Sequence, residues 1–73
     1  EIIPATVTTF GSFAFNGCVK ITEISLGANV TRVEQMAFDN MTATIHCPTQ
    51  AIADMITNSN SSSTSAQPTL IVG

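Results

Sequence analysis

The chain has 73 residues, 44% of them hydrophobic and 10% charged, with a formal net charge of −3. This length fits one small domain or part of one, and so little charge argues against a disordered segment. Lys20 and Arg32 are its only Lys or Arg residues, too few for a nucleic-acid surface or an anionic-membrane patch, and no apolar run reaches the length of a membrane span.

A twelve-residue pattern occurs twice, at Val7–Cys18 and at Val30–Met41, twenty-three residues apart. A Val-Thr pair and an Ala-Phe pair recur at matched positions. Self-similarity at a period of roughly 20–30 residues is typical of a solenoid, whose repeats bury their apolar faces against one another. We therefore expect the rings of Phe15 and Phe38, which share a repeat position, to lie close together in similar surroundings.

The first residues match the end of a repeat unit, because Ile3 falls in register with Leu26. We interpret Glu1–Pro4 as the trace of an earlier repeat and expect further sequence before it in the parent protein. The alternative is an unprotected edge, through which the chain could self-associate.

The first full copy predicts a strand followed by a tight turn. Residues 7–10 are rich in residues that favour strands. Ala14, Phe15 and Cys18 are expected to face inward on a short helical turn, and Asn16–Gly17 is a turn dipeptide.

Each copy then leads into a second strand with two-residue alternation. Ile24 is expected to point inward and Ser25 outward. The second copy reaches this strand two residues early, so that Ile45 and Cys47 take the inward places and His46 an outward place.

After Pro48 the repeat pattern stops. Thr49 fits an N-cap, and Ile52, Met55 and Ile56 fall on one face of a short helix. We interpret this region as a cap over the last repeat, because terminal repeats of solenoids are commonly atypical. The expected division is repeats over residues 1–48 and a C-terminal cap over residues 49–73, with a helix at about 50–57, a flexible loop at 58–67 and a strand at 69–72.

The chain resembles the BspA-type leucine-rich repeat. The resemblance covers roughly residues 2–48 and rests on these positions in order: Ile3, Pro4, Val7, Thr8, Phe10, Gly11, Ala14, Phe15, Cys18, Ile21, Ile24 and Leu26. It implies a β-rich, α/β horseshoe-like leucine-rich-repeat solenoid with a short capping helix and a final strand. It also implies a cell-surface or secreted protein that acts in adhesion or protein contact rather than catalysis.

Two surfaces are candidates for partner binding. Phe13 and Met36 share the position before the Ala-Phe pair, where they would either pack on each other and on the shoulder of the coil or form an apolar stripe for a partner. Ser25 and His46 belong to an outward ladder on the strand face.

No constellation of residues supports catalysis or metal binding. His46 and Cys47 are adjacent in a strand and so point to opposite faces, and no third group orients them. Cys18, His46 and Cys47 lack paired ligand spacing. We expect buried free cysteines, with one disulfide as the alternative, and no cofactor.

The scattered carboxylates, Asp39 among them, are expected to keep the surface soluble. Asn29, Asn40 and Asn60 each begin an N-glycosylation motif. In a secreted eukaryotic protein, Asn60 in its loop would be the expected acceptor.

The sequence therefore predicts a non-catalytic, extracellular or cell-surface module for adhesion or protein binding. Its partner would be a host protein, an extracellular-matrix protein or a neighbouring domain. The alternative function is a structural spacer or capping segment of a larger multidomain surface protein.

Overall fold

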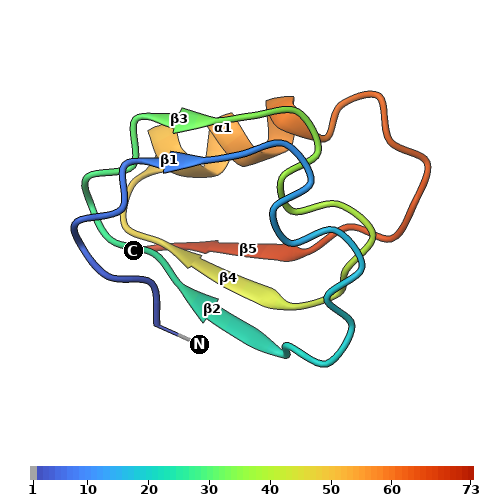
Figure 1. Ribbon diagram of the computed structural model, residues 1–73. Coiled ribbons are helices and arrows are strands. Elements are labelled where there is room, and N and C mark those ends of the chain that lie inside the picture. Colours follow the sequence, from blue (N-terminus) through green and yellow to red (C-terminus); the bar gives the residue numbers. More distant parts are fainter. Residues whose placement is uncertain (1) are drawn as a thin grey trace.

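The computed structural model describes residues 2–73, and the predicted place of Glu1 in an earlier repeat lies outside these residues. Short parallel strands form two sheets, and one helix lies beside them (Figure 1). The strands and the helix are, in chain order, β1 (Thr9–Phe10), β2 (Glu23–Ser25), β3 (Arg32–Val33), β4 (Thr44–Cys47), α1 (Gln50–Ser59) and β5 (Thr69–Val72).

The two sheets form opposite sides of the molecule (Figure 1). β1 pairs with β3 on one side, and β2, β4 and β5 pair in that order on the other. Ile24 is opposite Ile45, whereas Phe10 is opposite Val33. The second strand of the repeat thus comes two residues early in the second copy, as the sequence indicates. Among residues 2–73 both sheets are open.

Backbone hydrogen bonds join the turns of the two copies. The N–H groups of Phe13, Phe15 and Gly17 donate to the carbonyls of Gln35, Ala37 and Asp39, at 3.4, 2.7 and 3.4 Å. Because the donors alternate along the chain, this side of the first turn presents only donors and the facing side of the second turn only acceptors. We call these three bonds the turn ladder.

The two turns also share their unusual backbone angles. Gly17 has φ +75° and Asn40, its counterpart, has φ +52°. Gly and Asn are the residues that adopt this left-handed conformation most readily, which explains why both serve here. Gly11 is not in this conformation, which is consistent with its replacement by Glu34 in the second copy.

Three aromatic rings form the centre of the core. The rings of Phe15 and Phe38 stack with centroids 5.1 Å apart and planes 7° apart, as the alignment of the two copies predicts. Their surroundings are not alike, because Phe38 is fully buried and Phe15 is half-buried. The ring of Phe10 lies 5.0 Å from that of Phe38. Ile24 and Ile45 are also fully buried, so the core lies between the two sheets.

The expectation that Ala14, Phe15 and Cys18 face inward is wrong in part. Ala14 is exposed, and Phe15 and Cys18 are half-buried. Their counterparts in the second copy are fully buried. The second copy is covered on both sides, by the first copy and by the C-terminal elements, whereas the first copy is covered on one side.

The C-terminal elements continue both sides of the molecule (Figure 1). β5 pairs with β4, with Leu70 opposite Ile45, and α1 packs on β3, β4 and β5. The Thr49 hydroxyl accepts from the N–H of Ile52 at 3.3 Å and begins the helix. The helix continues to Ser59 and is capped by Asn60, two residues beyond its expected end.

Candidate functional site

The outer face of the three-stranded sheet brings Ser25 and His46 side by side in register. Ile71 of β5 follows His46, and Ile2 bridges to Ser25 from the other side. Ile2 and Ile71 are both exposed. The sequence predicts the outward ladder of Ser25 and His46 but not its extension to Ile71, which places an exposed aliphatic side chain on either side of this pair.

His46 Nε2 lies 3.1 Å from Glu23 Oε2, a contact that is ionic when the imidazole is protonated. Cys47 next to it is buried and its thiol donates to the Ile45 carbonyl. The imidazole and the thiol therefore face opposite sides of β4. This arrangement offers no nucleophile–base contact of the kind that acyl-transfer chemistry requires.

Cys18 and Cys47 are both free thiols. Burial raises the pKa of the Cys47 thiol, and a protonated thiol is a poor nucleophile. Cys47 therefore serves as a small apolar side chain of the core.

Phe13 and Met36 both adopt left-handed backbone angles, φ +59° and +56°. Phe13 is 56% exposed and Met36 is half-buried. Neither belongs to the hydrophobic core or to the partly buried side chains packed against it. Both therefore direct apolar surface away from the core at the same point of the turn.

Asp39 is only 4% exposed, so the expectation that it serves surface solubility is wrong. Its carboxylate accepts hydrogen bonds from Ser63 Oγ, from Gln67 Nε2 at 2.8 Å and from Asn16 Nδ2 at 3.4 Å. The pKa of Asp39 lies below its usual value mainly because the Ser63 hydroxyl donates a hydrogen bond to it. Burial raises this pKa, whereas the hydrogen bonds from Gln67 and from the Asn40 backbone lower it further. This cluster ties residues expected to form a flexible loop to the second repeat.

Asn60 is also buried, and its side-chain nitrogen donates to the Phe38 carbonyl and to Gln67 Oε1, at 3.1 and 2.9 Å. An attached glycan would break both bonds, so the expectation that Asn60 is the accessible acceptor is wrong. Asn29 donates to the Ala5 carbonyl at 2.9 Å. Asn29 and Asn40 are both exposed.

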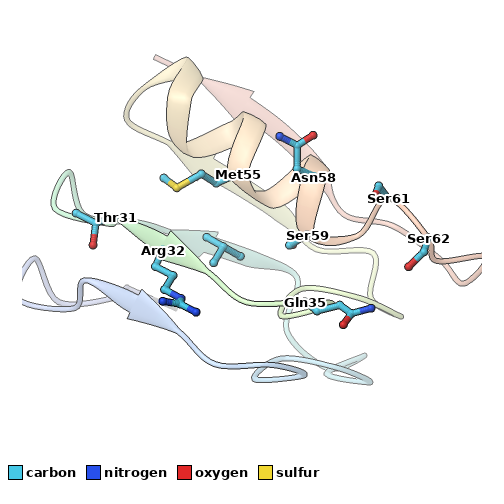
Figure 2. Close-up of a pocket in the computed structure, with 9 residues that line it drawn as sticks. Thr31, Arg32, Gln35, Met55, Asn58, Ser59, Ser61 and Ser62 are labelled. Carbon is cyan, nitrogen blue, oxygen red and sulfur yellow. The ribbon is translucent and has the colours of Figure 1, made fainter.

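A groove between β3 and α1 is the feature that sequence reasoning missed. Its volume is about 540 Å³. Figure 2 shows that its lining comes from β3 and residues on either side of it, from α1 and from the following loop. The lining residues are Thr31, Arg32, Val33, Gln35, Met55, Asn58, Ser59, Ser61 and Ser62. No sequence motif marks it, because it arises where a helix takes the place of a further repeat strand.

Residues 2–73 contain no group of three or more His, Cys, Asp or Glu side chains that could hold a metal ion. Across the same part of the chain, no helix has the length and apolarity needed to cross a bilayer.

The repeated coil, its turn ladder and its aligned core define a leucine-rich-repeat protein. A model of the BspA type leucine rich repeat region (6 copies) matches residues 2–67. The chain therefore belongs to the BspA-type leucine-rich-repeat family, as the sequence predicts. No curated protein and no solved structure was found to match the chain.

Family membership carries general properties. Repeats of this kind typically mediate protein–protein interaction. They are generally non-catalytic and are common on bacterial surfaces.

Proposed function

We propose that this chain is a non-catalytic adhesion or protein-binding module of a cell-surface or secreted repeat protein. In this proposal residues 1–48 are coils of a solenoid and residues 49–73 are its C-terminal cap. The partner is a host protein, an extracellular-matrix protein or a neighbouring domain. Support comes from the interaction role typical of the family and from the exposed side chains on the turns and on the outer sheet face.

The backbone conformation of Phe13 and Met36 is the observation that carries the proposal. A left-handed conformation costs a residue with a Cβ roughly 1–2 kcal/mol, and glycine avoids that cost. Strain of this kind persists where the surrounding structure imposes it, and it clusters at functional sites. Two apolar side chains, both outside the core, keep this strained position in successive repeats, which supports a role in contact with a partner.

Ser25 and His46 form the second part of the proposed binding surface. They lie in register on the outer sheet face, with exposed Ile71 beyond His46. A mixture of polar groups and isolated aliphatic side chains is typical of the surfaces that non-obligate protein partners cover.

The test is a double variant, Phe13→Gly with Met36→Gly, measured against a panel of immobilised extracellular-matrix proteins and the neighbouring domains of the parent protein. We expect the melting temperature to stay unchanged or rise, because glycine removes the backbone strain at both positions. Binding to the partner should fall by at least about tenfold, since buried aromatic anchors commonly carry that much of an interface. Biolayer interferometry and thermal denaturation measure the two effects.

Val19→Ser is the matched control, because Val19 is an exposed apolar residue outside these turn positions. It should leave binding unchanged. A fall in melting temperature of the glycine variant would mean that Phe13 and Met36 pack structurally. Absence of binding by the unmodified chain to every member of the panel would favour the alternative, a structural spacer or capping segment.

A further inference from the structure

The groove between β3 and α1 has the dimensions of a ligand site. Its volume of about 540 Å³ falls in the range of roughly 300–1,000 Å³ in which small-molecule pockets lie. It is separate from the turn positions and the outer sheet face described above. Its walls combine one cation, several amide and hydroxyl groups and the thioether of Met55 (Figure 2).

The groove exists because the helix α1, and not a further repeat strand, lies next to β3. The N–H groups of Arg32 and Glu34 donate to carbonyls of the first copy, at 3.2 and 2.9 Å. In a parallel ladder alternate residues pair on alternate sides, so the N–H and C=O of Val33 face away from β1 and towards α1. A helix cannot continue that ladder, which leaves a strand edge along one wall of the groove.

Arg32 supplies positive charge at this wall of a chain whose net charge is −3. Its Nε lies 3.1 Å from Glu34 Oε2. Figure 2 shows the Arg32 side chain on the side of β3 away from α1, and it is 68% exposed, so a change of rotamer can turn it to a carboxylate in the groove. Such a contact is bidentate and charge-assisted.

The remaining wall groups are free to bind hydroxyls. In the part of the chain that the structure describes, the side chains of Gln35, Asn58, Ser61 and Ser62 make no hydrogen bond within the protein. Ser59 differs, because its hydroxyl donates to the Ile56 carbonyl at 2.8 Å. Amides and hydroxyls both donate and accept, which is the requirement for a ligand that carries several hydroxyl groups.

We infer that this groove binds a saccharide that carries a carboxylate, such as a hexuronic acid of one or two rings. The carboxylate pairs with Arg32, the ring hydroxyls with the amides and serines, and the ring C–H face with Met55. An acidic polypeptide fits less well, because Arg32 is the one cation among the groove residues and the further carboxylates of a polypeptide would meet a chain of net negative charge. The inference does not depend on the proposed protein-binding function.

The test is an NMR titration of the ¹⁵N-labelled full chain with glucuronate at constant ionic strength, with glucose and acetate as matched probes. Glucuronate should shift the amide signals of Gln35, Asn58, Ser61 and Ser62, whereas glucose or acetate alone should bind at least about tenfold more weakly. Arg32→Gln should raise the Kd for glucuronate by at least about tenfold, the effect of losing a hydrogen bond to a charged group. Arg32→Lys should give an intermediate value, because charge remains without the planar fork.

Lys20→Gln is the matched control, because it removes the other cation outside the groove. It should leave the glucuronate Kd unchanged, and the spectra of all variants should retain the dispersion of the folded chain. Three results would each overturn the inference: equal shifts from glucuronate and glucose, an equal loss of affinity in Lys20→Gln, or tighter binding of a tri-glutamate peptide at the groove.

Discussion

Asp39 shows how one buried carboxylate can organise a segment that looks unstructured in the sequence. It sits at the position that Asn16 occupies in the first copy, and the two side chains are hydrogen-bonded. Beyond it, Ser63 and Gln67 supply donors from the loop after α1. The second coil and the C-terminal segment are thus joined by polar contacts as well as by the core.

Asp39→Asn should lower the melting temperature at neutral pH, because the neutral amide is a weaker acceptor for Ser63 and Gln67 and places an NH2 donor where an oxygen now accepts from Asn16. Thermal denaturation monitored by circular dichroism measures this change. Asp54→Asn is the control, since Asp54 is an exposed carboxylate of α1 that accepts a hydrogen bond from Gln50. A melting temperature that falls equally in both variants would show that net charge, not the buried cluster, is responsible.

The same residue predicts the direction of acid sensitivity. The pKa of Asp39 is lower in the folded chain than its ordinary value of 3.8, so folding favours the ionised form. Its contribution to the free energy of unfolding is complete above about pH 4 and is lost as pH falls through the lower folded-state pKa. Urea unfolding from pH 6 downwards should show this loss in the unmodified chain. In Asp39→Asn the free energy of unfolding should fall less steeply as the pH is lowered. The same pH dependence of the free energy of unfolding in both proteins would contradict the role given to Asp39.

At the scale of single residues, the sequence predicts what repeats and misses what does not. Phe15 and Phe38 occupy matched positions in the pattern, and their rings stack. The burial of Asp39 depends on Ser63 and Gln67, twenty-four and twenty-eight residues away in a segment with no repeat. Composition describes such a segment as polar without indicating which side chains meet.

The helix α1 is the element that differs most from a further repeat. It packs where the next short strand would pair with β3, and Ile52, Ala53 and Ile56 are its buried residues. Its first turn contains no acidic residue. The Thr49 cap is therefore the main local feature that fixes where the helix begins.

Thr49→Ala should destabilise the chain by about 1 kcal/mol, the usual effect of removing an N-cap hydroxyl. The measurement is the free energy of unfolding in urea. Thr57→Ala is the control, because Thr57 is exposed within α1 and alanine is the better helix former there. A neutral Thr49→Ala variant would mean that packing alone fixes the start of the helix.

The end of α1 was harder to predict than its beginning. The N-cap signal is local, a threonine three residues before the N–H that it accepts. The helix continues to Ser59 and is capped by Asn60, whose side chain bonds to the Phe38 carbonyl and to Gln67. The tertiary bonds of Asn60 hold the last turn, and no pattern within the helix itself encodes them.

At the scale of the whole molecule, two coils and the C-terminal elements form a body of 28 × 22 × 19 Å. Such a body is too short to display the curvature of a long repeat array. The pairing of β1 with β3 and of β2 with β4 follows from the repeat, because matched parts of the two copies meet across each sheet. The register of β5 does not, since it lies outside the repeat. The different environments of the two copies could not be predicted from their similar sequences, since burial depends on which elements lie on each side of a copy.

That difference predicts unequal effects of the same substitution. Phe38 is fully buried, so Phe38→Ala should destabilise by about 3–5 kcal/mol. A chain of this length has a total stability of about 4–10 kcal/mol, so a large fraction of this variant should be unfolded or close to unfolding. Phe15→Ala, at the matched half-buried position, should remain folded with a smaller loss. Equal losses in urea denaturation would contradict the unequal packing of the two coils.

The turn ladder gives each coil a polarity that restricts how it can be joined to others. The carbonyls of Gln35, Ala37 and Asp39 point towards the first coil. By repeat equivalence, the carbonyls of Ser12, Ala14 and Asn16 point away from the second coil. The outer rim of the first coil is therefore all acceptor, and two such rims brought face to face would set oxygen against oxygen. A twofold-symmetric interface between identical subunits is therefore disfavoured at this rim. A neighbouring segment can pair with it only by offering backbone N–H donors.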